Sequence, residues 1–205
     1  LIMSSTNRGY ERHISDFYVT PEEPITQFLE KFIVIDKSNF FTSMTSVLDP
    51  CAGGNDKYDM PYPSALRKQG FKLISTIDIR NDSKAEYKNN YLETNVNITS
   101  EFIISNPPFN LALDFINKAL NDVKDGGFVV FLLRLNFFGS QSRQSFFKEN
   151  MPKYCFIHSK RMSFFPENIE LSGKLFKKGS TDSIEYAHFV WQKGYKTDFT
   201  KTYVI

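Results

Sequence analysis

Several protein classes are excluded by what the sequence lacks. No stretch approaches the roughly 18 consecutive apolar residues of a membrane-spanning helix, and no secretory signal is visible, so no membrane association is expected. The two cysteines, Cys51 and Cys155, lie far apart and form no metal-like pair, which favours reduced thiols in the cytosol. His13, His158 and His188 show no metal-ligand spacing, so each is interpreted as structural and no metal site is predicted.

Three common catalytic signatures are also missing. Gly53 and Gly54 are not followed by Gly-Lys-Ser or Gly-Lys-Thr, which excludes a phosphate-binding Walker loop. The glycines do not have the Gly-x-Gly-x-x-Gly spacing of dinucleotide oxidoreductases, and no Gly-x-Ser-x-Gly elbow of a hydrolase occurs. These absences argue against a nucleoside triphosphatase, an oxidoreductase and a serine hydrolase.

The composition that remains is that of an ordinary globular protein. The 205 residues are 41% hydrophobic and 23% charged, with a net charge of +2. This length predicts one α/β domain over residues 1–205, without room for a separate target-recognition domain. The small net charge neither demands nor excludes a nucleic-acid partner, because a polyanion can bind a local basic face.

Short apolar runs alternate with helical patterns along most of the chain. Strands are expected at 45–48, 72–77, 101–105, 127–133, 154–158 and 184–191, and helices at 21–32, 64–69, 111–123 and 142–150. This alternation predicts a mainly parallel sheet covered by helices. Segment 184–191 alternates less cleanly, which is compatible with an antiparallel edge strand. Thr20 is the expected cap of the first helix, with Pro21 at its first position.

Glycine and aspartate residues stand where two of these strands end. The run Asp49-Pro50-Cys51-Ala52-Gly53-Gly54-Asn55 follows strand 45–48, and Asp78 ends strand 72–77. Ligands bind beyond the carboxyl ends of strands in an open α/β sheet. Adjacent glycines allow close approach of the backbone to a ligand, and an acid roughly 20 or more residues later suits ribose hydroxyls. An ordinary glycine turn and an aspartate turn or cap are the alternatives.

A third strand, 101–105, ends in the run Asn106-Pro107-Pro108-Phe109. Two consecutive prolines fix two φ angles and supply no N–H donor, so the segment cannot continue a sheet ladder. The run instead presents carbonyl oxygens and an asparagine side chain at a fixed orientation. A stiff turn is the alternative, but asparagine before Pro-Pro-aromatic at the end of a buried strand is a specific pattern.

The three runs resemble, in this order, motifs I, II and IV of class I S-adenosylmethionine-dependent methyltransferases. The Asn-Pro-Pro-Phe form is similar to that of the amino-methyltransferases, particularly the N6-adenine DNA enzymes. Residues 161–194 resemble the small phage-type adenine methyltransferases. Tyr18-Val19-Thr20-Pro21 resembles their motif X, so the resemblance spans residues 16–135. It implies a Rossmann-like fold: a mainly parallel seven-stranded sheet with an antiparallel edge hairpin and helices on both faces.

S-adenosylmethionine is the cofactor that the resemblance implies. The residues expected to bind it are Tyr18, Thr20, Pro21, Asp49, Pro50, Cys51, Ala52, Gly53, Asp78, Ile79, Tyr91 and Asn106. Asp49 would lie near the methionine amino group of the cofactor, and Asp78 would hold the ribose. The acid that family members often carry in motif III is missing from Asn90-Tyr91-Leu92-Glu93. The Asn90 side chain, a backbone group or Glu93 could serve instead.

The resemblance also implies the catalytic residues, which are Asn106, Pro107, Pro108 and Phe109. The Asn106 side-chain oxygen and the Pro107 carbonyl would accept hydrogen bonds from the target amino group, localising its lone pair. Phe109 would stack on the target base, which must leave a duplex to reach the site. Core packing is the alternative reading of Phe109.

DNA is the partner that the resemblance implies. Basic residues interleaved with aromatic ones between residues 160 and 178 suit a surface that binds phosphates and bases. Arg161 and Lys174 are the residues of this segment expected to bind substrate, and a solvated loop is the alternative reading. Arg134 and Arg143 flank the end of strand 127–133 and the following helix, where a DNA backbone or the helix end could use them. A homodimer or a partner subunit is compatible with the small size. We expect a cytoplasmic location in a bacterial or phage-infected cell.

Two other functions remain open from the sequence. RNA or a protein glutamine amide could be the methyl acceptor, since the same Asn-Pro-Pro-aromatic run serves any delocalised amino nitrogen. A non-catalytic methyltransferase-like subunit is the third possibility, although such proteins typically lose the catalytic motif that Asn106 begins here.

Overall fold

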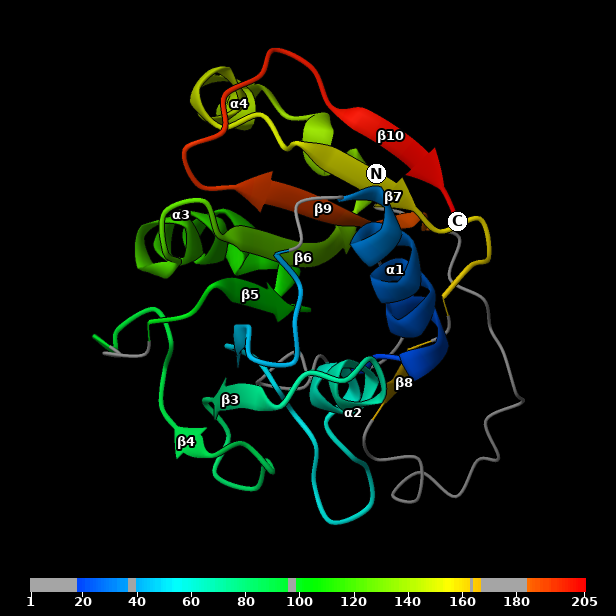
Figure 1. The fold of residues 1–205 in the computed structure, drawn as a ribbon, viewed down its shortest axis with the longest axis vertical. Coiled ribbons are helices and arrows are strands. Elements are labelled where there is room, and N and C mark those ends of the chain that lie inside the picture. Colours follow the sequence, from blue (N-terminus) through cyan, green and yellow to red (C-terminus); the bar gives the residue numbers. More distant parts are fainter. Residues whose placement is uncertain (1–17, 37–39, 96–98, 163, 167–183) are drawn as a thin grey trace, which may run out of the picture.

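The computed structural model describes residues 18–36, 40–95, 99–162, 164–166 and 184–205. Within this part of the chain, an eight-stranded sheet has the order β10-β7-β9-β6-β5-β2-β3-β4 (Figure 1). Its strands are β2 (Ser46–Asp49), β3 (Leu73–Asp78), β4 (Tyr87–Lys88), β5 (Phe102–Ser105), β6 (Phe128–Arg134), β7 (Tyr154–Ile157), β9 (Tyr186–Gln192) and β10 (Lys201–Val204). Six of these correspond to the predicted strands, with bounds shifted by no more than a few residues.

The mainly parallel sheet with one antiparallel strand is confirmed. Every pairing in this sheet is parallel except those of β9 with β6 and β7. Two details differ from the expectation: β10 adds a strand beyond the seven, and β9 lies inside the sheet, two strands from the β10 edge. Six of the seven β9 residues are buried, which explains why segment 184–191 alternates poorly.

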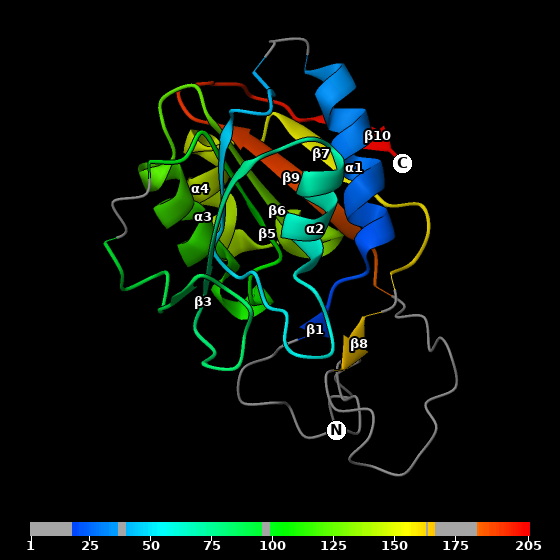
Figure 2. The ribbon, with the colours of Figure 1, turned by 60° about the horizontal axis from the view of Figure 1, so that its bottom comes forward.

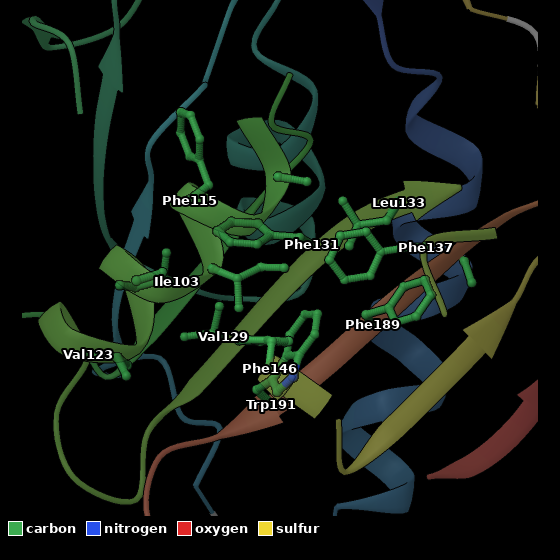
Figure 3. Packing of buried hydrophobic residues seen from close by; sticks show 14 of the residues in the cluster. Ile103, Phe115, Val123, Val129, Phe131, Leu133, Phe137, Phe146, Phe189 and Trp191 are labelled. Atoms are coloured by element: carbon green, nitrogen blue, oxygen red, sulfur yellow. The ribbon is translucent and has the colours of Figure 1, made fainter. Parts of the chain in front are cut away.

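Helices cover both faces of the sheet, as expected. Helices α1 (Glu22–Ile35) and α2 (Pro61–Lys68) pack on one face, where Phe102, Phe128 and Val130 point. Helices α3 (Ala112–Asp122) and α4 (Gln144–Glu149) cover the other face, together with the turns η1 (Phe109–Leu111), η2 (Leu135–Phe138) and η3 (Gln141–Arg143). Figure 3 shows this second cluster, in which Ile103 and Val129 pack among aromatic rings. Successive residues of β5 and β6 therefore point to opposite layers.

The start of α1 corrects one prediction. The helix begins at Glu22, and Pro21 is its N-cap residue in an extended conformation, without a side-chain cap. Thr20 therefore does not cap the helix, and its hydroxyl is used elsewhere. Tyr18–Val19 forms strand β1, which pairs antiparallel with β8 (Phe165–Pro166). Figure 2 shows this two-stranded ribbon beyond the N-terminal end of α1. No described helix is long and apolar enough to span a membrane.

A chain of buried polar side chains crosses the α1–α2 layer. The Tyr62 hydroxyl is hydrogen-bonded to Nε2 of His188 at 3.0 Å, and Nδ1 of His188 to Nε2 of His158 at 2.7 Å. The Phe28 ring stacks on the His188 ring, with centroids 4.2 Å apart. Burial lowers the pKa of His158 to about 4 and holds the pKa of His188 well below its usual range. Both imidazoles are therefore neutral near pH 7 and serve the core, as the sequence analysis predicted.

Removing the Tyr62 hydroxyl should destabilise the fold. In Tyr62→Phe, one ring nitrogen of the fully buried His188 loses its partner, which costs about 1–3 kcal/mol. Urea unfolding at pH 7.5 measures this loss. Tyr87→Phe at an exposed tyrosine is the control and should change the free energy of unfolding by less than about 0.5 kcal/mol. Equal stability of the two variants would contradict this role of the hydrogen bond.

Candidate active site

The carboxyl ends of three adjacent parallel strands bring the predicted residues together. Strands β5, β2 and β3 are neighbours in the sheet, and they end at Ser105, Asp49 and Asp78. The side chains of all three residues are buried. The Asn106 run begins directly after β5, and the glycine run (residues 49–55) begins at the last residue of β2, so both open onto the same edge of the sheet.

The glycine run is held in one conformation by the chain after β3. The Gly53 N–H donates to Asp78 Oδ2 at 2.8 Å, and the Gly53 carbonyl accepts from the Lys84 N–H at 3.1 Å. Nη2 of Arg80 donates to the Gly54 carbonyl at 2.9 Å. Both glycines have positive φ angles, of 66° and 72°, which other residues adopt with strain. The loop is thus preorganised before any ligand binds.

Asp49 is a buried carboxyl group with one oxygen unused. Its Oδ1 accepts hydrogen bonds from the Ser105 hydroxyl at 2.5 Å and from the Cys51 N–H at 3.1 Å. Its Oδ2 is buried and has no hydrogen-bond partner in the described part of the chain. Burial raises the pKa of Asp49 to about 7, against the lowering effect of these hydrogen bonds. An unpartnered buried carboxylate oxygen fits a cationic group such as an ammonium.

Asn106 presents an unused acceptor at the end of β5. Its Nδ2 donates to the Thr20 hydroxyl oxygen at 2.9 Å, which joins the chain before α1 to the Asn-Pro-Pro-Phe run. Its Oδ1 is buried without a hydrogen-bond partner in the described residues. The next ring, Pro107, is buried, and the Pro108 carbonyl accepts from the Leu111 N–H at 2.9 Å, closing the turn. The geometry therefore offers an amide oxygen to an N–H donor.

Phe109 is partly buried beside two other side chains. Its ring centroid lies 5.7 Å from that of Tyr186, and the Arg134 guanidinium carbon lies 5.1 Å from it. The Phe109 ring thus packs against other side chains, which agrees with the core-packing alternative. Phe109 also lies only three residues after Asn106 in the same run. Stacking on a base stays a prediction.

No protein-family model matches the sequence, and no curated protein matches it. Solved structures match its fold. A protein of Listeria monocytogenes described as a class I S-adenosylmethionine-dependent methyltransferase has a TM-score of 0.59 and 17% identity over 91% of this chain. The M protein of the type I restriction enzyme EcoKI gives 0.58 and 12% over 91%. The protein in the complex of aTrm5 with tRNALeu gives 0.55 and 17% over 86%.

The chain has the class I methyltransferase fold. It spans 65%, 48% and 47% of the lengths of those three proteins. The sequence resemblance is thereby confirmed at the level of the fold.

Within the methyltransferase fold, the other predicted residues lie in different surroundings. Tyr91 is only 2% exposed and its ring contacts Phe115 and Lys118, so it is part of the core. Ile79 is 63% exposed directly after Asp78. Cys51 is partly buried beside Asp49, and burial raises the pKa of its thiol. Pro50 and Ala52 are buried in the same run.

The structure describes only some of the remaining predicted site residues. The Asn90 side-chain oxygen accepts from the Leu92 N–H at 3.2 Å, so it is engaged in its own turn. Arg161 is exposed. Lys174 and the side chain of Tyr18 lie outside the described residues. Among the residues described, no group of three or more His, Cys, Asp or Glu residues could hold a metal ion.

Sequence reasoning missed two residues that shape this candidate site. Ser105 holds Asp49, and the signal for it is a polar residue that ends the apolar run 101–105. Arg80 holds the Gly54 carbonyl, and its side chain is only 9% exposed. Nothing local in the sequence marks Arg80, because its partner lies 26 residues earlier.

The raised pKa of Asp49 should make stability depend on pH in a defined direction. The folded state binds a proton between about pH 4 and pH 7, whereas the unfolded state does not, so stability falls as pH rises through this window. Relative to Asp49→Asn, the wild type should lose up to about 1.4 kcal/mol per pH unit there, and no more above it. Urea unfolding at pH 4.5–8.5 measures the difference, in which the histidine contribution cancels.

The matched control is Asp198→Asn at an exposed aspartate, which should show no such trend. A difference between the wild type and Asp49→Asn that stays constant from pH 4.5 to 8.5 would contradict the assignment.

Proposed function

We propose that this protein transfers the methyl group of S-adenosylmethionine to an amino nitrogen of a nucleic acid, most specifically N6 of adenine in DNA. The observation that carries the proposal is the Asn106 amide at the end of β5. Its nitrogen is bound by Thr20 at 2.9 Å, while its buried oxygen has no hydrogen-bond partner in the described residues. A buried acceptor without a partner is costly, and such atoms concentrate where ligands bind.

The cofactor would lie along the carboxyl ends of β2 and β3. The free Oδ2 of Asp49 suits the methionine ammonium, and the preorganised Gly53 backbone permits close approach. The Asp78 carboxylate, already bound by the Gly53 N–H, keeps lone pairs for ribose hydroxyls. The exposed Ile79 offers an apolar surface to the adenine ring. Bound S-adenosylmethionine supplies an electrophilic methyl group on its sulfonium.

The contribution of the protein itself would be orientation and fixed dipoles. An aromatic amino group is a poor nucleophile because its lone pair is delocalised into the ring. Hydrogen bonds to the Asn106 oxygen and the Pro107 carbonyl would localise the lone pair and aim it at the methyl group. Thr20 would keep the Asn106 amide in the orientation that exposes its oxygen. No side-chain nucleophile is required.

Nucleic acid is the acceptor class best supported. Two proteins with this fold are the M protein of a restriction enzyme and a protein in complex with tRNA. We infer that DNA enters with its target base turned out of the duplex. Short loops such as the one that carries Arg161, or a partner subunit, would then read the sequence. We infer further that the reaction takes place in the cytoplasm of a bacterial or phage-infected cell.

A side-by-side assay separates the acceptors. DNA, RNA and protein are incubated with the enzyme and methyl-labelled cofactor, and the nucleosides and peptides are identified by mass spectrometry. N6-methyl-2′-deoxyadenosine from DNA supports the proposal. Label found only in RNA or only in glutamine would show that the acceptor is RNA or protein instead. A titration without detectable cofactor binding would favour the non-catalytic subunit.

Asn106→Ala should abolish methyl transfer but not cofactor binding. Loss of the amide oxygen removes a hydrogen bond to the reacting amino group, so we expect kcat to fall on the order of 100-fold or more. The dissociation constant for S-adenosylmethionine should change by less than about threefold. Single-turnover transfer and calorimetric titration measure the two quantities.

Asp78→Ala is the comparison variant, because Asp78 faces the glycine run rather than Asn106. It should weaken the cofactor first, on the order of tenfold or more, since it also frees the Gly53 N–H. Wild-type turnover in Asn106→Ala would show that the catalytic assignment is wrong.

The Thr20 hydroxyl should matter for turnover through Asn106. Thr20→Val keeps the shape of this buried side chain but removes the acceptor of the Asn106 amide, so kcat should fall roughly tenfold. Thr20→Ser retains a hydroxyl and should keep most of the activity. Steady-state methylation at saturating cofactor measures both variants, and equal rates would rule out this orienting role.

A further inference from the structure

Arg134 stands beside the proposed catalytic run but outside its hydrogen bonds. It is the last residue of β6, which lies between β5 and β9 in the sheet. Its partner in β9 is Tyr186. Its guanidinium carbon lies 5.1 Å from the centroid of Phe109, the last residue of the Asn-Pro-Pro-Phe run. Arg134 is partly exposed, so a ligand can reach it. A fixed positive charge therefore borders the place where the acceptor would enter.

The guanidinium has no anionic partner in the described part of the chain. The Arg134 side chain makes neither a hydrogen bond nor an ion pair there, and its Nε is buried and unpartnered. A buried donor left without a hydrogen bond costs about 1–3 kcal/mol, and the contact with the Phe109 ring offsets part of that cost. The contact with the Phe109 ring uses the face of the guanidinium, which leaves its N–H groups for a ligand.

The second arginine of this region shows the contrast. Arg143 Nε donates to the Phe137 carbonyl at 2.7 Å, and its guanidinium lies 4.5 Å from the Phe137 ring centroid. Its donors therefore stabilise the turns before α4. Of the two arginines that flank the end of β6, only Arg134 keeps its donors free.

We propose that Arg134 binds a backbone phosphate next to the target nucleotide, and so makes the site selective for polynucleotides. This inference rests on the proposed methyl transfer at Asn106. A guanidinium matches a phosphate through paired N–H donors and a full positive charge. Every nucleotide within a DNA or RNA strand is flanked by phosphates, whereas a glutamine side chain carries none. The aromatic contact between Arg134 and Phe109 places this phosphate within reach of the target base.

Salt dependence of binding tests the proposal directly. Binding of a fluorescent single-stranded DNA of 12 nucleotides is measured between 50 and 300 mM NaCl for the wild type, Arg134→Gln and Arg134→Lys. Loss of one phosphate contact should weaken binding roughly tenfold and lower the slope of log K against log salt by about 0.7. Lysine, which keeps the charge, should restore the slope. Lys148→Gln, at an exposed lysine on α4, removes the same charge and should leave both quantities nearly unchanged.

A chemical change in the strand locates the contact. The strand contains one adenine, and a neutral methylphosphonate replaces each phosphate near it in turn. At one linkage the wild type should lose as much affinity as Arg134→Gln does, while Arg134→Gln should lose nothing further. The same series in RNA shows whether the site accepts ribose as well as deoxyribose. A loss of affinity at one linkage in either strand supports the phosphate contact.

Two outcomes separate failure of this inference from failure of the proposed function. If the wild type methylates DNA but Arg134→Gln keeps the wild-type slope and affinity, Arg134 does not bind phosphate. If the wild type binds the cofactor but methylates only glutamine, the nucleic-acid function fails and the phosphate site with it. A purely structural role of Arg134 would lower the melting temperature without changing the salt slope.

Discussion

The hydrogen bond between the Ser105 hydroxyl and Asp49 Oδ1 joins the two halves of the site. One half is the proposed cofactor side, built from the ends of β2 and β3, and the other is the Asn-Pro-Pro-Phe run after β5. Because these strands are parallel neighbours, a hydrogen bond of 2.5 Å can tie their ends together. The same contact fixes which oxygen of Asp49 stays available. The relative placement of the cofactor side and Asn106 thus depends on sheet register, which shifts only if the core layers shift with it.

Several buried polar groups of the core are hydrogen-bonded to one another, whereas two buried oxygens of the site are not. In the core, Tyr62, His188 and His158 satisfy one another, and Nε1 of Trp191 donates to the Asn150 carbonyl at 2.9 Å. At the sheet edge, Asp49 and Asn106 each keep one buried oxygen without a partner in the described residues. The hydroxyls of Tyr91 and Ser100 are also buried without a hydrogen-bond partner in the described residues, so one such atom does not mark a ligand site. The oxygens of Asp49 and Asn106 differ in that both lie at the ends of neighbouring strands, where a ligand would complete them.

Much of the fold and part of the site could be read from the sequence. Nearly continuous apolar runs before Asn106 and Arg134 located two of the strands, since strands buried on both faces need such runs. Three features could not be read. The partners of β9 depend on contacts between distant segments, which periodicity does not encode. Thr20 looked like a helix cap because both roles use the same hydroxyl. Nothing in the sequence distinguishes Arg134 from Arg143, since the difference lies in which carbonyls the folded chain presents to each.

The position of β9 between β6 and β7 has a consequence for how the chain is made. The ribosome completes β7 at Ile157, yet β9 begins only at Tyr186, after residues 158–185 have been added. At about 5–20 residues per second this takes a few seconds. Until then β6 and β7 each present an unpaired edge, and such edges invite pairing with other chains. Strand β9, which joins β6 to β7, is synthesised after both of them. During that interval the nascent chain is open to pairing with other chains.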